Sequence, residues 1–376
     1  MITADEKHHE ENITFRVLSA LGILFVVMGH MGYTLLEFET WFPFYSFHMA
    51  LFAFISGYFY SSENDSHPGT FLIRKAKSLL VPFYAVSLFY LLLQTGLNKQ
   101  GVTLGLDFTF YNWLIRPWVK CQPLGFNIAT WYMIALFITE ALYILLRIIT
   151  GFIKSDKARN LLLLILLGAG STLVITGSPY PEEWQRVWLR PVFLCFFCHL
   201  GYLYRNYAEN RVRIPKGVLL AVILFIRFLL ISNYGRLEYR LWDCNFWGLP
   251  GWAILLTTAL GIAFWLIVAK IITPLVDRDG LLVRIGRHTR EIMSHHLFAA
   301  FLWHGGIYLL HRVFAWEVPF HPGDWKTDLY FRYIPWKGFN LITVIACVGL
   351  VLFAVWLRDK CTAKAGRLLR RGNTRP

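Results

Sequence analysis

The chain has 376 residues, of which 56% are hydrophobic and 17% aromatic, and its mean hydropathy is +0.47. Charged residues make up 16%, against about a quarter in soluble domains, so the composition excludes an ordinary soluble globular protein. The formal net charge of +14 would suit a nucleic-acid partner. In a membrane protein, however, basic residues gather in cytoplasmic loops, so no nucleic acid is needed to explain the charge.

Apolar segments recur along the whole chain, and a helix needs about 20 apolar residues to cross a bilayer. Charges, Pro and Gly bound ten such segments: 17–36, 44–60, 79–97, 129–152, 161–177, 187–204, 217–233, 250–275, 292–311 and 338–357. We predict one all-α domain over residues 1–376, a polytopic bundle of about ten transmembrane helices in the cell (plasma or inner) membrane. The polar segment 1–15 has no signal-peptide pattern, so the first span is expected to be retained. The tail 358–376 is basic.

Basic residues between the spans predict the orientation of the bundle. They cluster in alternate loops, as in Arg74, Lys75 and Lys77, whereas the first opposite loop, EFETWF, has none. Because cytoplasmic loops carry the excess of Lys and Arg, we expect both termini in the cytoplasm.

Two histidines lie in the first two apolar segments, His30 in 17–36 and His48 in 44–60. A titratable side chain in a bilayer segment costs about 2 to 3 kcal/mol, so each is a candidate for function. At about 100° per residue, Arg16, Ser19 and His30 share one helix face, with His30 about 20 Å beyond Arg16. The structural alternatives are a snorkelling Arg16 and a His30 that is hydrogen-bonded to a neighbouring helix.

Other polar residues lie within the later spans. Glu140, in 129–152, is a carboxylate that could orient a catalytic histidine. His199, Arg227, His304 and His311 are interpreted as structural. Cys195 and Cys198 form a CxxC inside an apolar run, which favours small buried hydrophobes over a zinc or redox site, so neither a metal nor structural disulfides are predicted.

Five stretches carry a resemblance to a known family: Arg16 through MGH at 28–30, FHMALFAFISGYFY at 47–60, FLIRKAKSLLVPFY at 71–84, ATWYMIALFITE at 129–140 and IGRHTREIMSHHLF at 285–298. Together they resemble the acyltransferase 3 family of integral membrane acyltransferases, in particular its branch resembling fucose O-acetylases. The resemblance covers about residues 15–300.

The resemblance implies transfer of an acyl group, usually acetyl from acetyl-CoA, to a hydroxyl of an extracytoplasmic carbohydrate or related acceptor. It implies a catalytic role for His30. His48 and His296 lie in two further family motifs, and both are candidate catalytic residues. Arg74 and Lys77 match a basic pair that could hold the phosphates of coenzyme A. The family's basic residue in the first span would fall at Ser19 here, so Arg16, one turn earlier, is its possible substitute. Gly57 is expected to serve close helix packing.

The sequence leaves open two catalytic routes for His30 and two further classes of function. His30 could act as a general base on the acceptor hydroxyl or carry the acyl group as an acyl-histidine. A transporter or flippase for a sugar or lipid-linked substrate also needs many spans and polar residues near the midplane. Against it, no pair of broken helices is evident. A receptor is a third class, which no feature indicates. The predicted partners are therefore acyl-CoA, an envelope acceptor and the bilayer.

Overall fold

The computed structural model describes residues 11–32, 41–120, 125–177, 181–209, 211, 213–314 and 319–372, with side chains up to residue 363. Within these ranges the chain is helical, apart from loops and one isolated bridge between Arg240 and Asn245. The predicted all-α class is confirmed. Most of the polar N-terminal segment, Cys121 and the end of the basic tail lie outside the described residues.

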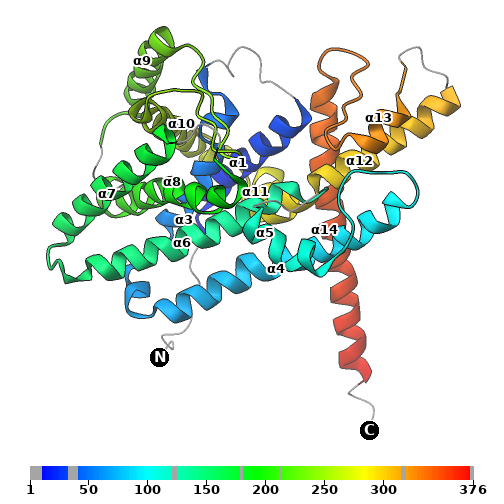
Figure 1. Ribbon diagram of the computed structural model, residues 1–376, viewed down its shortest axis with the longest axis horizontal. Helices are drawn as coiled ribbons and strands as arrows, with labels where there is room; N and C mark the ends of the chain where they lie inside the picture. The colour runs from blue at the N-terminus through cyan, green and yellow to red at the C-terminus, as the bar shows by residue number, and fades with distance from the viewer. Residues whose placement is uncertain are drawn as a thin grey trace.

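In the part of the chain that the structure describes, ten helices build the bundle, whose arrangement is shown in Figure 1. They are α1 (Ile13–Met31), α3 (His48–Tyr58), α4 (Pro68–Asn98), α6 (Trp131–Ile149), α7 (Asp156–Thr176), α8 (Glu183–Leu203), α9 (Lys216–Tyr234), α10 (Gly251–Ile272), α12 (Thr289–Phe314) and α14 (Phe339–Gly372). Short helices α5 (Arg116–Val119), α11 (Leu281–Arg287) and α13 (Pro322–Thr327) lie between them. Among the described residues, nine helices are long and apolar enough to cross a membrane.

The second predicted span, 44–60, does not form a membrane-crossing helix in the structure. Residues 44–60 form a 3₁₀ turn at Phe44–Ser46 and then α3, which has 11 residues. That helix is about 16 Å long, too short to cross a bilayer core of about 30 Å. It begins at His48 because Phe47, with φ −156° and ψ −23°, is not in a helical conformation.

Contacts between neighbouring helices fix their directions. Lys75 meets Glu140 at one end of α4 and α6, and Ser87 meets Asn127 at the other, so these helices are antiparallel. Comparable pairs show that α1, α4, α7, α9 and α12 run one way and that α3, α6, α8, α10 and α14 run the other. The alternation agrees with the predicted topology. We call the side of the loops after α3, α6, α8 and α10 the inner side and the opposite side the outer side.

Helices α3 and α8 cross in close backbone contact. A Cβ at Gly57 would overlap the carbonyl of Cys198, and one at Gly201 would overlap the carbonyl of Phe54. Small residues at such a crossing let two membrane helices approach closely. The packing role predicted for Gly57 is confirmed.

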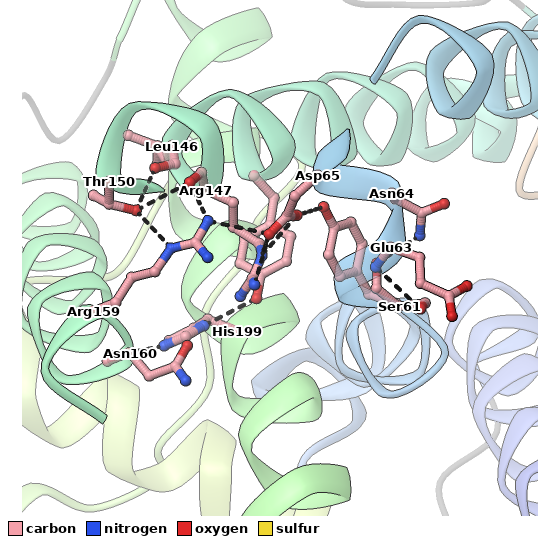
Figure 2. A network of polar contacts seen from close by, with 12 residues as sticks. Ser61, Glu63, Asn64, Asp65, Leu146, Arg147, Thr150, Arg159, Asn160 and His199 are labelled. Carbon is pink, nitrogen blue, oxygen red and sulfur yellow. Dashed lines mark hydrogen bonds and ion pairs between the residues drawn. The ribbon is translucent and has the colours of Figure 1, made fainter. Parts of the chain in front are cut away.

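A polar network fastens the inner loop between α3 and α4 to the bundle (Figure 2). The carboxylate of Asp65 accepts hydrogen bonds from Arg147 Nη2 at 2.8 Å, Arg159 Nη2 at 3.1 Å and the hydroxyl of Tyr60 at 2.5 Å. Arg147 is fully buried. Partial burial acts to raise the pKa of Asp65, but the hydrogen bonds from Arg147 and Tyr60 outweigh it and hold the pKa below its ordinary value.

Replacing Asp65 with asparagine should therefore destabilise the protein in a pH-dependent way. Because its folded pKa is depressed, the carboxylate stabilises the fold above its unfolded pKa of about 4, and this contribution is lost as pH falls through the folded pKa. We expect the free energy of unfolding at pH 7 to fall by about 1.5 to 3 kcal/mol, which is the typical contribution of a hydrogen bond to a charged group. Unfolding in detergent at pH 7 and pH 3 measures it. The exposed Glu63→Gln on the same turn is the control, and an equal deficit at both pH values would contradict the assignment.

Candidate active site

A cavity of about 660 Å³ lies between α1, α3, α4, α6 and α12 and reaches into the outer loops. The stretch of α1 from Ser19 to His30 lines it over about 16 Å, so the predicted shared face of these two residues is confirmed. Most of the wall is apolar. Its polar side chains are Ser19, His30, Tyr45, His48, Ser56, Lys75, Ser78, Tyr132, Glu140, Tyr239, Arg240, Thr289, Arg290, Tyr330 and Arg332.

The cavity has a polar rim on each side of the bundle. The inner rim comprises Lys75, Ser78, Thr289 and Arg290, and the outer rim comprises Tyr45, Arg240, Trp242, Tyr330 and Arg332. Side chains of both rims reach the surface: Arg290 is 47% exposed and Arg240 is 50% exposed. Residues from both sides of the bundle therefore line one cavity.

His30 lies in the last turn of α1, with its ring in the cavity wall. The helix ends there because Gly32 takes a left-handed φ of 66° and its N–H bonds Met28 O. From the outer loop, Tyr330 stacks on the imidazole with ring centroids 5.6 Å apart and planes 6° apart, and Arg332 Nη2 donates to His30 O at 3.0 Å. The outer loop thus holds the histidine in place.

His296 of α12 lies beside His30, with ring centroids 5.1 Å apart. Its Nδ1–H donates to Ile292 O at 2.9 Å and to Met293 O at 3.0 Å. Its Nε2 therefore carries the lone pair, and this fully buried atom has no hydrogen-bond partner among the described residues. His296 is absent from the cavity wall, and its ring packs against that of His30.

His48 opens α3 in the cavity wall and is 7% exposed. Its Nδ1–H donates to Phe44 O at 2.5 Å, and Tyr45 meets its ring edge-on at 5.3 Å. Since a carbonyl can only accept, Nδ1 is the protonated nitrogen and Nε2 keeps the lone pair in the neutral ring. The structure thus brings His30, His48 and His296 to one region.

Glu140 lies elsewhere in the cavity, toward the inner rim. One oxygen accepts from the hydroxyl of Ser56 and from Lys75 Nζ, the latter at 2.5 Å. Its side chain is 3% exposed, and its other oxygen has no hydrogen-bond partner among the described residues. The prediction that Glu140 orients a histidine is wrong: the carboxylate instead neutralises a lysine inside the bundle.

The cations predicted to bind the cofactor lie outside the cavity. Arg74 and Lys77 share the exposed face of α4, where Arg74 Nη2 bonds Asn64 at 3.0 Å. Arg16 pairs with Glu11 at 2.6 Å on the inner surface. These three residues do not line the cavity, and their predicted role in binding the cofactor stays a prediction.

Sequence reasoning missed Lys75 and Arg290, the two cations of the inner rim. Lys75 lies four residues after buried Phe71 and eight before buried Phe83, and this spacing could have placed it on the inward face of α4. Pro82 supplies a second signal. It has no N–H, so the carbonyl of Ser78 lacks its usual helical donor and is free to accept from a side chain of another helix. Arg290 Nη1 contacts that carbonyl at 3.4 Å instead.

The residues interpreted as structural fit that role. His199 is fully buried, with Nε2 donating to Asn160 O and Nδ1 accepting from the hydroxyl of Tyr143, each at 3.0 Å. Arg227 donates to Trp41 O and lies over the ring of Phe42. Cys195 and Cys198 are buried in α8. Across the described residues, no group of three or more His, Cys, Asp or Glu side chains is arranged to hold a metal.

Comparison with protein families matches residues 13–359 to the model of the acyltransferase 3 family, described as an acyltransferase domain. The match spans every long helix and ends at residue 359, within α14. Searches of curated proteins and of solved structures gave no match.

Proposed function

The chain belongs to the acyltransferase 3 family and is a multi-pass membrane O-acyltransferase, and from this premise we propose that it moves an acyl group from acyl-CoA on the inner side to a hydroxyl on the outer side. The proposed group is acetyl, the proposed acceptor is a carbohydrate or related envelope molecule, and the proposed location is the cell membrane. Membership in this family replaces the transporter or flippase alternative.

The observation that supports this proposal is the cavity itself. A thioester arm that enters at the inner rim can extend along the apolar wall toward His30, while an acceptor hydroxyl approaches from the outer rim. An apolar wall suits an uncharged arm, whereas the coenzyme's phosphates would be costly to bury and would stay at the inner rim. Each substrate thus has its own entrance.

His30 is the residue best placed for the chemistry. As a general base, its neutral imidazole takes the proton of the acceptor hydroxyl while that oxygen attacks the thioester carbonyl; the C–S bond breaks and the thiolate leaves, taking up the proton. In the covalent route, His30 first displaces the thiolate and then passes the acyl group to the hydroxyl. In both routes the ring of His296 packs against that of His30, and His48 lies in the wall on the acceptor side.

The inner rim makes a prediction for acyl-CoA binding. Arg290 lines the cavity, whereas Arg74 and Lys77 lie outside it. Arg290→Gln should therefore raise the KM for acyl-CoA by about tenfold, which corresponds to the loss of one charge-assisted hydrogen bond. The double variant Arg74→Gln/Lys77→Gln should raise KM less and mainly at low salt, since exposed charges are screened. Initial-rate kinetics measure both, with the exposed Lys157→Gln on α7 as control. An unchanged KM in the Arg290 variant would count against this donor entrance.

Purified protein in proteoliposomes tests the function as a whole. With labelled acetyl-CoA and envelope extract as acceptor, we expect release of free CoA together with an alkali-labile acyl label on the acceptor. Movement of acceptor across the bilayer without thioester consumption would support a flippase and contradict the proposal.

A further inference from the structure

The charge of the outer rim points to the kind of acceptor. Two of its side chains, Arg240 and Arg332, are cations, and the carboxylate in the described cavity wall, Glu140, is paired with Lys75 toward the other side. An acceptor at the outer rim therefore meets two arginines and, among the described lining residues there, no carboxylate.

Membrane topology does not explain these cations. The positive-inside rule depletes outer loops of Lys and Arg, yet Arg240 comes from the loop between α9 and α10 and Arg332 from the loop between α12 and α14. Residues from two separate loops converge on one cavity. A ligand that binds both arginines would explain why they line the same cavity, whereas membrane topology would not.

Both guanidinium groups are held in position. Arg240 Nη2 pairs with Asp243, which does not line the cavity, at 2.8 Å, and the group lies over the ring of Trp247 at 5.6 Å. Arg332 packs on Gly32, where a Cβ would overlap it, and bonds the backbone of His30. One cation is thus attached directly to the turn that carries the proposed catalytic residue.

We propose that the acceptor is an anionic glycan, in which a carboxylate or phosphate near the acylated hydroxyl binds Arg240 and Arg332. The inference rests on the proposed function and deepens it. Arginine forks bind both groups in a bidentate manner, and such a contact places the hydroxyl relative to His30. Tyr45, Trp242 and Tyr330 supply aromatic surface for the apolar faces of a sugar at the same rim.

Partition of the labelled product tests the charge of the acceptor, because O-acylation leaves the acceptor's charge unchanged. Protein in proteoliposomes receives labelled acetyl-CoA and total envelope extract, and all labelled products other than acetate and acetyl-CoA are separated by anion exchange. We expect the label in the retained, anionic fraction. Mild acid then moves a pyrophosphate-linked product to the neutral fraction and leaves a carboxylate-bearing one retained, which distinguishes the two sources of charge.

Variants connect that charge to the two arginines. Arg240→Gln and Arg332→Gln should each raise the KM for the retained acceptor about tenfold, with partial recovery in Arg240→Lys. Arg236→Gln, in the same outer loop as Arg240 but outside the cavity wall, is the matched control. Label in the neutral fraction, or an unchanged KM in both glutamine variants, would overturn the inference while acyl transfer itself stands. Release of label only as acetate, or no thioester consumption, would instead overturn the proposed function.

Discussion

Replacing His30 with alanine is expected to abolish acyl transfer in a protein that still folds. General base catalysis contributes about 10²- to 10⁴-fold to a rate, and loss of a nucleophile removes the covalent route entirely. Because His30 is partly exposed to the cavity rather than packed in the core, its truncation should change the unfolding temperature little. Initial rates with labelled acetyl-CoA in proteoliposomes, together with thermal unfolding in detergent, measure the two effects.

The exposed His67→Ala at the start of α4 is the matched control, and it should keep wild-type activity. Acid-quenched protein also separates the two chemical routes: label retained on the wild-type chain and lost in His30→Ala indicates an acyl-histidine. Full transfer in His30→Ala would remove this residue from the mechanism.

The largest effect on stability is expected from Lys75→Met. The change leaves the carboxylate of Glu140 inside the bundle without its cation, and breaking a buried pair in this way costs about 3 to 5 kcal/mol. The double variant Lys75→Met/Glu140→Gln removes both charges and should recover most of the loss. Unfolding of the three proteins in detergent gives the coupling energy.

Lys77→Met, on the exposed face of the same helix, is the control for the loss of a lysine. A Lys75 variant no less stable than this control would show that the pair contributes little to the fold. Equal losses in the single and double Lys75 variants would show that the cost lies in packing rather than in an unpaired carboxylate.

The apolar periodicity predicted the parts of the fold that depend on the bilayer. Spans, alternating directions and the shared face of Ser19 and His30 follow from helix geometry and from the cost of exposing backbone to lipid. Composition could not show that α3 is short, because the apolar run continues from Phe44 while the backbone of one residue, Phe47, leaves the helical conformation.

The site was predictable only in part. His30, His48 and His296 are rare titratable residues in apolar segments, so each stands out singly, and the structure places them together. The pairing of Glu140 with Lys75 rather than a histidine depends on how α4 packs against α6, which the spacing within one helix does not determine. Arg240 and Arg332 come from irregular outer loops, where no periodicity indicates which side chains point inward.

The account's central claim is that one cavity joins a donor entrance on the inner side to an acceptor entrance on the outer side. Sealed membrane vesicles of the two orientations from producing cells test it most directly, with labelled acetyl-CoA added only to the outside. In inverted vesicles the acyl label should appear on lumenal acceptor, protected from added glycosidase until detergent is present, and intact right-side-out vesicles should remain unlabelled. Equal labelling of right-side-out vesicles, or label accessible on the donor's own side, would contradict the claim.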